Sequence, residues 1–275
     1  MAANDGIRLD TWLVQNGYAG GREKAKELIA ADYVSVDGRT MKKASFCVTP
    51  TMMVTCTAPT QKYVGRGGYK LEKALAISSI SADGAICMDV CASTGGFTDC
   101  MLQNGAAHVY AVDVGHDQLH PTLRANERVT ALESTDIRSE ALKAAVPAGS
   151  IGLCSVDVSF VSLTRILPSV LPYLAKDATL ICLIKPQFEA GVGDVGKRGV
   201  VKDRRVHIRV LGQMLALFDS LHLKLTHLTY SPITGGEGNI EYLAVLGGSA
   251  ATTAIDIAAV VDEAHTALKG NVKQR

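Results

Sequence analysis

Two charged side chains stand directly after apolar segments in the second half of the chain. Asp157 follows residues 151–156, and Lys185 follows residues 179–184, just before Pro186. If both segments are strands of a parallel sheet, their carboxyl ends meet at the edge where such sheets bind ligands. A lysine that ends so apolar a strand should be partly desolvated, which lowers the pKa of its ammonium group towards neutrality. Such a lysine can take the proton of a hydroxyl group that attacks an electrophile.

A second lysine and a second carboxylate would complete this candidate catalytic group. Lys70 can act as the second cation, while Asp157 and one further carboxylate would orient the lysines and balance their charge. Glu241, Glu237 and Glu189 compete for that role, and spacing alone does not choose among them. Each residue taken singly also has a structural explanation, because a lysine can extend along an apolar surface to solvent.

A loop of small residues lies between the first predicted strand of the sheet and the helix that follows. Small side chains allow the backbone to approach a ligand closely, and the helix N-terminus offers free N–H groups to an anion, here the carboxylate of a methionine moiety. The loop does not match G-x-G-x-x-G, so a dinucleotide is disfavoured. The residues assigned to cofactor binding in this segment are Asp89, Cys91, Ala92, Ser93, Gly95, Gly96 and Phe97.

Acidic residues at the ends of the next two predicted strands indicate an adenosine-containing cofactor, S-adenosylmethionine. Asp113 lies 24 residues after Asp89, close to the spacing of roughly 20 at which a carboxylate accepts hydrogen bonds from a ribose diol. Asp136 follows the third strand, where it can accept from the adenine amino group. A single aspartate at the end of a strand is more often a helix cap or a turn residue than a ligand-binding residue. Three such aspartates at successive strand ends, together with a Gly-Gly loop, favour binding of a cofactor that contains a nucleoside. The same site is assigned Val114, Ile137 and Asp157.

Short apolar segments alternate with helix-period segments from about residue 85 onward, as expected for a sheet built from βαβ units. Their nearly continuous hydrophobicity indicates burial on both faces by helices. Residues 225–230 and 240–246 flank a glycine-rich segment and predict a closing antiparallel pair. The predicted fold class is therefore α/β, with a mostly parallel seven-stranded sheet. Its parallel strands are expected at residues 85–90, 107–113, 129–132, 151–157 and 179–184.

A small α+β module precedes this sheet. Apolar residues three and four apart predict two short helices around residues 9–13 and 25–29, and Val34 and Val36 lead into the hairpin dipeptide Asp37-Gly38. Residues 58–62 have the composition of a linker, and apolar residues at 254–268 predict a C-terminal helix. We therefore expect a division into residues 1–60, 61–248 and 249–275.

The composition is that of an ordinary globular protein, which we expect in the cytoplasm. Hydrophobic residues make up 47% and charged residues 20%, and no stretch approaches the roughly 18 apolar residues of a membrane span. The N-terminus lacks the basic and apolar regions of a signal peptide. The 7 cysteines include no C-x-x-C pair, so we expect reduced thiols and no metal site.

Local basic clusters, rather than the net charge of +1, indicate a nucleic-acid partner. Residues 197–209 hold six basic residues and one acidic residue, and this segment can bind phosphates beside the Lys185 strand. A solvated helix face with a loop is the alternative. Residues 1–62 carry eight basic and six acidic residues, a weak excess. The candidates in the first segment are Lys197, Arg198, Arg204 and Arg205.

Several of these segments resemble motifs of the TlyA or hemolysin-A-type proteins, a family similar to FtsJ-like ribose 2′-O-methyltransferases with an N-terminal S4-like RNA-binding domain. The motifs lie at residues 8–10, 63–71, 89–98, 157–160, 183–189 and 238–242. The resemblance implies a Rossmann-like class I methyltransferase fold, S-adenosylmethionine as cofactor, and a cytidine ribose of ribosomal RNA as methyl acceptor. The family's Lys-Asp-Lys-Glu tetrad falls on Lys70, Asp157, Lys185 and Glu241, which selects Glu241 among the competing carboxylates.

The resemblance also implies RNA binding by the first module. It departs from the family pattern where Gly21 replaces the usual serine and where Tyr33 replaces a glycine, a change that can alter a tight turn. The residues implied in RNA contacts are Arg8, Arg22, Lys26 and Arg66.

Three other functions compete with methyl transfer. A pore-forming haemolysin would need exposed membrane-active segments, whereas the apolar segments here are predicted as buried strands. A non-catalytic RNA-binding protein of ribosome assembly would not need the cofactor loop and the tetrad. An NAD-linked enzyme would need a different glycine pattern.

Overall fold

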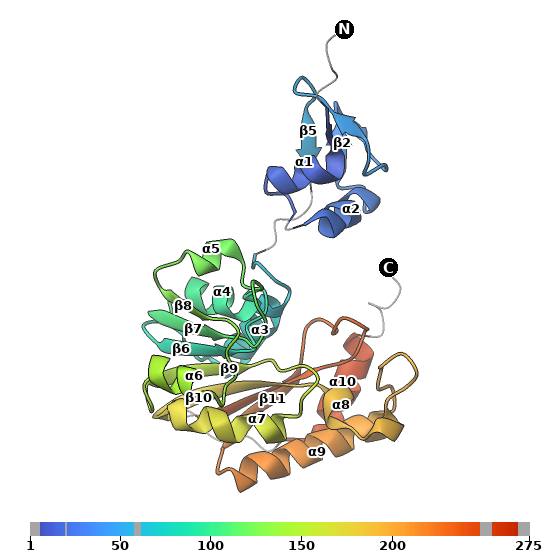
Figure 1. Cartoon of the computed structure of the whole chain (residues 1–275). Helices are drawn as coiled ribbons and strands as arrows, with labels where there is room; N and C mark the ends of the chain where they lie inside the picture. The colour runs from blue at the N-terminus through green and yellow to red at the C-terminus, as the bar shows by residue number, and fades with distance from the viewer. Residues whose placement is uncertain (1–5, 20, 58–61, 248–254, 269–275) are drawn as a thin grey trace. The chain divides into compact units, whose positions relative to one another are not determined.

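The computed structural model describes residues 6–19, 21–57, 62–247 and 255–268. The chain divides into two units, Met1–Gln61 and Lys62–Arg275, each with hydrophobic side chains buried within it (Figure 1). Residues 58–61 of the linker predicted at residues 58–62, and residue 254, the first of the predicted C-terminal helix, lie outside the described residues.

The first unit packs two helices on short strands. Leu9, Leu13 and Ile29 from the helices are almost fully buried with Val34 and Val36. Asp37 and Gly38 form the predicted hairpin turn with positive φ angles of 50° and 76°. Strands of two or three residues are too short to show periodicity, so most were not predicted. The elements are β1 (Ile7–Arg8), α1 (Leu9–Gln15), α2 (Arg22–Ala30), β2 (Val34–Val36), β3 (Arg39–Thr40), β4 (Cys47–Val48) and β5 (Val54–Cys56).

The second unit is built on a seven-stranded sheet in the order β11-β12-β10-β9-β6-β7-β8. Strands β6 to β10 are parallel, and β12 lies antiparallel between β10 and β11. The predicted fold class, including the closing antiparallel pair, is confirmed. The strands are β6 (Ile86–Val90), β7 (His108–Val112), β8 (Val129–Leu132), β9 (Ile151–Val156), β10 (Leu174–Ile184), β11 (Leu225–Tyr230) and β12 (Tyr242–Gly247).

The predicted start of β10 was wrong by five residues. The strand begins at Leu174 rather than at residue 179, because the exposed residues Lys176 and Asp177 interrupt the apolar pattern. The pairing of β10 with β9 shifts register between Leu174 and Thr179, where these charged residues leave the ladder.

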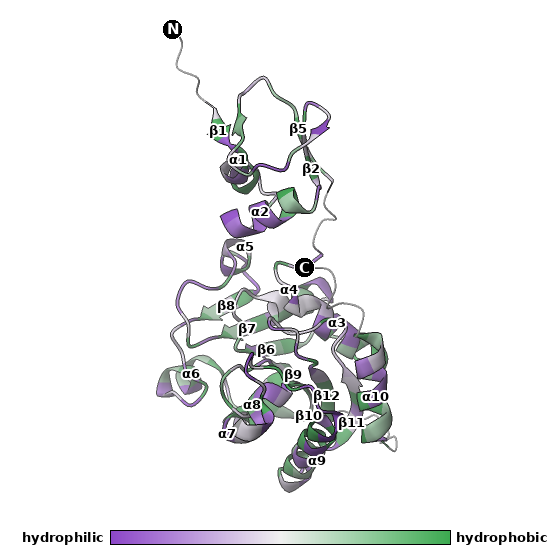
Figure 2. Ribbon diagram, turned by 90° about the vertical axis from the view of Figure 1, so that its right-hand side faces the viewer, coloured by the Kyte–Doolittle hydropathy of each residue, from purple (hydrophilic) through white to green (hydrophobic). Residues whose placement is uncertain are grey.

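Alternate strand residues face opposite layers of helices. Met88 and Val90 pack with α6, α7, α9 and α10, whereas Cys87 packs on the other face with α3 and α4. Figure 1 shows α3 and α4 on one side of the sheet and α7 and α9 on the other, and the parallel strands are largely green in the hydropathy colours of Figure 2. The helices are α3 (Gly67–Ser78), α4 (Gly96–Gln103), α5 (Pro121–Arg124), α6 (Glu140–Ala145), α7 (Leu163–Val170), α8 (Pro186–Glu189), α9 (Arg204–Ser220) and α10 (Ile257–Ala267).

Candidate active site

Four charged side chains from four separate segments converge at the carboxyl edge of the large sheet. Lys185 follows β10 and Asp157 follows β9, and Lys185 Nζ lies 2.7 Å from Asp157 Oδ1. Lys70 Nζ, from α3, lies 2.7 Å from Glu241 Oε2 and 3.8 Å from Asp157 Oδ2. The cluster therefore contains two cations and two carboxylates, and Asp157 interacts with both lysines.

The antiparallel strand β12 explains how Glu241 reaches this cluster. Its first residue, Tyr242, pairs with Ile184, the last residue of β10. Glu241 is consequently held beside Lys185, and its side chain is only 3% exposed. A buried carboxylate needs a charged or hydrogen-bonding partner, which Lys70 provides.

The two competing carboxylates lie elsewhere. Glu189 accepts hydrogen bonds from Ser162 Oγ and Leu163 N at the start of α7. Glu237 is exposed on the glycine-rich loop and forms no ion pair with any residue in the described ranges. The structure thus brings Glu241 to the lysines and leaves the other two apart.

Ser159 is a member of the site that the sequence analysis missed. Lys185 Nζ donates to Ser159 Oγ over 2.8 Å, in addition to its ion pair with Asp157. An ion pair with Asp157 and a hydrogen bond to Ser159 hold the amino group of a lysine that is 8% exposed. A serine three residues after the end of a strand has no distinctive spacing, so only its place in the segment Asp157-Val158-Ser159-Phe160 pointed to it.

The loop after β6 has an unusual backbone conformation. Cys91, Ser93 and Gly95 have positive φ angles of 66°, 49° and 92°, a region that costs a non-glycine residue about 1–2 kcal/mol. The N–H groups of Cys91 and Ala92 donate to the carbonyl of Val112 at the end of β7. The N-cap residue of α4, Gly95, has no side chain to cap the helix, and Asp89 accepts only from Thr98 N in its first turn, so the N–H groups of Gly96 and Phe97 remain available to a ligand.

Close packing of two glycine segments places Lys70 beside this loop. A Cβ atom at Gly96 would lie 2.9 Å from Gly68 N and 3.0 Å from Gly65 O, so only glycine fits at that position. The segment from Gly65 to Gly68 leads directly into the first turn of α3, which carries Lys70. The glycine segment at residues 65–68 and the glycine pair at residues 95–96 therefore pack directly against each other.

Asp89 is buried beneath the loop and joins it to β9. Its Oδ2 atom accepts from Thr98 N and Thr98 Oγ1 over 2.9 and 2.7 Å, and its Oδ1 atom accepts from Ser155 Oγ over 2.8 Å. Burial raises the pKa of Asp89 to about 6, against the opposing effect of these hydrogen bonds.

The raised pKa of Asp89 predicts a specific pH dependence of stability. Because the pKa is higher in the folded than in the unfolded chain, the contribution of protonated Asp89 is fully present below about pH 4 and is lost as the pH rises through about 6. Relative to the Asp89→Asn variant, the wild type should lose about 3 kcal/mol of unfolding free energy between pH 4 and pH 7. Urea unfolding of both proteins across this range measures the difference, and a difference independent of pH would contradict the assignment.

Asp113 also supports the loop. It is 9% exposed, and its carboxylate accepts from Ser93 N over 2.8 Å and from Gly115 N over 2.7 Å. Each oxygen accepts only one of these bonds, so lone pairs remain for a ligand hydroxyl. Val114, the next residue, is 65% exposed.

The residues assigned after the third strand have other contacts. Asp136 forms a two-point ion pair with Arg138, with side-chain bonds of 2.8 and 2.6 Å. The Asp136 side chain is 40% exposed, whereas Ile137 is 6% exposed and packs in the core. These contacts hold the turn after β8, and the structure does not bring either residue to the charged cluster.

One cavity, of about 260 Å³, connects the charged cluster to the loop. Lys70, Asp157 and Lys185 line it, whereas Glu241, Asp113, Val114, Asp136 and Ile137 do not. Its other lining residues are Arg66, Gly67, Asp89, Cys91, Ala92, Ser93, Thr94, Gly96, Phe97, Ser159, Ile233, Thr234, Gly235 and Gly236.

Two known protein families match parts of this chain. A model described as FtsJ-like methyltransferase matches residues 63–248, and one described as S4 domain matches residues 7–54. The chain belongs to the FtsJ-like methyltransferase family. The methyltransferase fold and the N-terminal S4 domain that the motifs implied are therefore confirmed.

Relatives of known name share both parts of this methyltransferase. The 16S/23S rRNA (cytidine-2′-O)-methyltransferase TlyA of Mycobacterium tuberculosis is 39% identical over 86% of this chain and 87% of its own length. Hemolysin A of Brachyspira hyodysenteriae is 40% identical over 86% of this chain and 98% of its own length. A solved Streptococcus thermophilus protein described as a candidate hemolysin is 37% identical, with a TM-score of 0.75 over 99% of this chain and 100% of that one.

Across residues 6–19, 21–57, 62–247 and 255–268, no helix is long and apolar enough to cross a membrane. The same residues contain no group of three or more His, Cys, Asp or Glu side chains arranged to hold a metal ion.

In the S4 domain of the methyltransferase, two of the implied RNA-binding arginines share one buried carboxylate. Arg8 and Arg22 lie 2.8 and 3.1 Å from Asp10 Oδ2, and the Asp10 side chain is fully buried. Their guanidinium groups are thus fixed beside each other while about half of each side chain stays exposed. Lys26 instead pairs with Glu23 within α2.

The two departures from the family pattern have limited structural effects. Gly21 precedes α2 with an extended backbone, and without a serine there the helix has no side-chain cap. The left-handed residue after α2 is Asp32, with a φ of 61°, rather than Tyr33. The expectation that Tyr33 alters a tight turn is therefore not supported by the backbone.

The remaining basic candidates differ in their partners. Arg66 donates to the carbonyl of Thr234 over 2.9 Å, across the cavity. Lys197 and Arg198 are exposed and form no ion pair with the described residues. Arg204 and Arg205 are paired, with Asp262 and with Asp203 respectively.

Phe160 is an exposed aromatic residue at the edge of the site that periodicity did not reveal. It is 91% exposed with a φ of 64°, and its ring centroid lies 5.0 Å from that of Phe188. A bulky residue with positive φ is uncommon and often has a functional role. The ring centroid of Phe188 in turn lies 5.9 Å from Lys185 Nζ, so this aromatic pair borders the charged cluster.

Proposed function

We propose that this protein is an S-adenosylmethionine-dependent methyltransferase whose methyl acceptor is a ribose 2′-hydroxyl, in a cytidine of ribosomal RNA. The observation that carries the proposal is the cavity lined both by the cofactor-type loop and by Lys70, Asp157 and Lys185. Family membership supports methyl transfer, and the name of the Mycobacterium tuberculosis relative supports the cytidine ribose as acceptor. Because ribosomal RNA is its proposed substrate, we place the protein in the cytoplasm.

The residues around the loop fit S-adenosylmethionine. The uncapped start of α4 suits the methionine carboxylate, and the lone pairs of Asp113 suit the ribose diol. Small side chains from Cys91 to Gly96 let the ligand lie against the backbone. We assign Val114, Asp136 and Ile137 to the adenine end with weaker geometric support, since none of them lines the cavity. When bound, the cofactor supplies an electrophilic methyl group on a positively charged sulfur.

Lys185 is the residue we assign to proton removal. In its free-amine form it takes the proton of the 2′-hydroxyl as the oxygen attacks the methyl group, since a ribose hydroxyl is a poor nucleophile without a base. Asp157 and Ser159 fix the position of its nitrogen. A base must lie within hydrogen-bond distance of the proton it removes, and these two contacts restrict the position of the nitrogen that would do so.

Lys70 and Glu241 complete the charge balance of the site. Lys70 lies between Glu241 and Asp157, so its ammonium group offsets a carboxylate on each side. A buried carboxylate without that partner would be strongly destabilising. The arrangement keeps Asp157 in place to orient Lys185 through the reaction.

The exposed residues around the site suit an RNA substrate. Phe160 presents a flat apolar surface on which an unstacked base can lie. Arg66 and the basic segment at residues 197–202 can bind phosphates, and the S4 domain adds Arg8 and Arg22.

Cofactor binding separates this function from the others. The proposed enzyme should bind S-adenosylmethionine in calorimetry and transfer its methyl group to ribosomal RNA, whereas a pore former or an NAD-linked enzyme should do neither. A protein that binds ribosomal RNA but not the cofactor would be an assembly factor, and the proposal would fail.

The Asp113→Ala variant tests the placement of the cofactor ribose. It should raise the Kd for S-adenosylmethionine about 5- to 150-fold, because hydrogen bonds worth roughly 1–3 kcal/mol are lost. The Asp117→Ala variant is the control, since Asp117 is exposed in the same loop and pairs with Arg124. Equal affinities for the two variants would reject the role of Asp113.

A further inference from the structure

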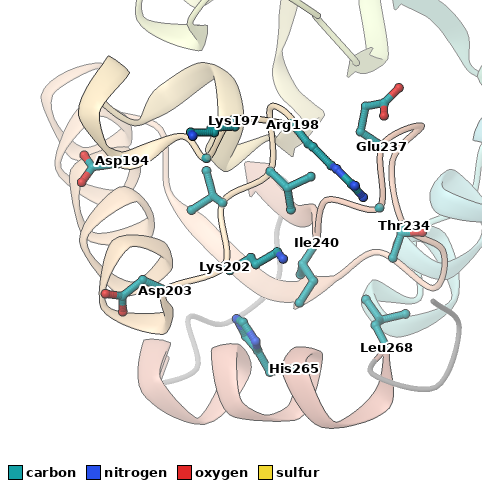
Figure 3. A pocket seen from close by; sticks show the side chains of 14 residues that line it. Asp194, Lys197, Arg198, Lys202, Asp203, Thr234, Glu237, Ile240, His265 and Leu268 are labelled. Atoms are coloured by element: carbon teal, nitrogen blue, oxygen red, sulfur yellow. The ribbon is translucent and has the colours of Figure 1, made fainter. Parts of the chain in front are cut away.

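A second cavity, of about 780 Å³, opens beside the one that contains the charged cluster (Figure 3). Thr234 lines both cavities. The walls of the second cavity come from residues 194–203, from the glycine-rich loop and from His265 and Leu268 of the C-terminal segment. Its volume lies within the roughly 300–1,000 Å³ typical of sites that enclose a small organic ligand.

Buried polar side chains fix the wall formed by residues 194–203. Asn239, which is 3% exposed, accepts from Val201 N over 3.0 Å and donates to Gly199 O over 2.9 Å. The fully buried His207 donates through Nε2 to Val201 O and lies 2.9 Å from the Tyr242 hydroxyl through Nδ1. The basic segment is therefore anchored to the glycine-rich loop and to the first residue of β12.

The cations of this wall fall into two groups. Lys197, Arg198 and Lys202 are exposed, line the cavity and form no ion pair within the part of the chain that the structure describes. The arginines that follow are neutralised by carboxylates, and two of those carboxylates belong to the cavity lining. The pairs are Asp194 with Arg209, Asp203 with Arg205 and Asp262 with Arg204.

The lining thus combines free cations with an apolar surface. Glu237 is its one carboxylate without an ion pair among the described residues, so three free cations stand against one free carboxylate. Ile240 and Leu268 supply apolar wall, and Figure 3 shows Arg198 and Lys202 extending into the space above Ile240. Free cations suit a phosphate group, and the apolar wall suits the face of a nucleobase.

We propose that this cavity binds a nucleotide of the substrate RNA adjacent to the one that is methylated. Lys197, Arg198 and Lys202 hold its phosphate, and its base lies against Ile240 and Leu268. The proposal rests on the proposed function, since it takes the target ribose to lie beside Lys185. An RNA strand with its target there continues past Thr234, the residue common to the two cavities, into the second one.

The test compares two variants that lose the same charge. The first is Lys197→Gln/Arg198→Gln/Lys202→Gln, and the control is Lys143→Gln/Lys176→Gln/Lys224→Gln, near the opposite edge of the sheet. Binding of unmethylated ribosomal RNA should weaken at least about tenfold in the first variant only. Its slope of log Kd against log salt should fall by about 0.7, as expected when one phosphate of a single strand is no longer neutralised. Calorimetry should show unchanged S-adenosylmethionine binding in both.

Two further measurements distinguish a nucleotide of the RNA from other occupants. The Val200→Trp variant fills the cavity without a change of charge and should also weaken RNA binding. Equal RNA affinity and salt slope in the charge variant and its control, or normal RNA binding by Val200→Trp, would overturn the proposal. A different result would show that the cavity is a site for a free nucleotide instead. In that case cytidine 5′-monophosphate would bind tightly to the wild type and not to the charge variant, while both proteins would bind RNA equally well. These are binding measurements, so failure of methyl transfer alone would reject the proposed function but not this inference.

Discussion

Replacing Lys185 with methionine should lower the rate of methyl transfer by roughly 10²- to 10⁴-fold, the usual contribution of a general base. Methionine keeps most of the aliphatic stem of the lysine but cannot accept a proton. Because Lys185 contacts Asp157 and Ser159 and not the start of α4, the affinity for S-adenosylmethionine should be unchanged. Single-turnover rates on ribosomal RNA, with calorimetry for cofactor affinity, measure the two effects separately.

Lys176 provides the matched control. It is an exposed lysine at the start of the same strand, far along β10 from the cavity. The Lys176→Met variant should retain full activity. Near-normal turnover by Lys185→Met would remove Lys185 from the role of base and leave the proton to another group.

Removing residues 1–60 should lower kcat/KM for ribosomal RNA by roughly 10²-fold or more, because linked binding sites on one chain gain about 10²–10⁴ in joint affinity. The methyltransferase unit has its own buried core, so the shortened protein should still bind S-adenosylmethionine with unchanged affinity. Methylation assays at increasing RNA concentration separate a change in KM from a change in kcat.

A milder change in the S4 domain provides the second arm of that experiment. In Arg8→Gln/Arg22→Gln the buried Asp10 loses both arginine partners and keeps only its bonds from Thr11, whereas Lys42→Gln/Lys43→Gln removes the same charge from residues that do not contact Asp10. The first pair should weaken RNA binding more than the second. Full activity of the shortened protein on intact ribosomal RNA would show that the S4 domain does not recognise this substrate.

The central strands of the sheet were predictable because they are buried on both faces, as β9 is along nearly its whole length. The strands predicted at residues 129–132, 151–157 and 225–230 match the observed ones to within one residue, although the edge strands β8 and β11 are only partly buried. Asp157 and Lys185 were also predictable, since the ends of neighbouring parallel strands meet at one edge.

The other half of the cluster was not predictable from spacing. Lys70 and Glu241 are 171 residues apart in the sequence, and only the insertion of β12 between β10 and β11 brings them together. Their assignment before the structure depended on resemblance to a family. A contact between distant segments leaves no periodic signal within either segment.

The ion pairs of the basic segment could not be predicted from the sequence either. Residues 197–209 present one basic cluster in the sequence, yet Arg204 and Arg205 are neutralised, while Lys197, Arg198 and Lys202 have no ion pair within the described parts of the chain. The partners, Asp262 among them, come from other segments. Phe160 combines a positive φ angle with a contact to Phe188, and neither feature can be read from the composition. Its exposure could therefore not be predicted.

The atom that receives the methyl group distinguishes methylation of a cytidine ribose from methylation of a nucleobase. Unmethylated ribosomal subunits would be incubated with the protein and S-adenosylmethionine carrying a labelled methyl group, and the RNA would then be digested to nucleosides. We expect label in 2′-O-methylcytidine, formed roughly 10²- to 10⁴-fold more slowly by the Lys185→Met variant. Label on a nucleobase, or no label in RNA from subunits that the protein binds, would contradict this expectation.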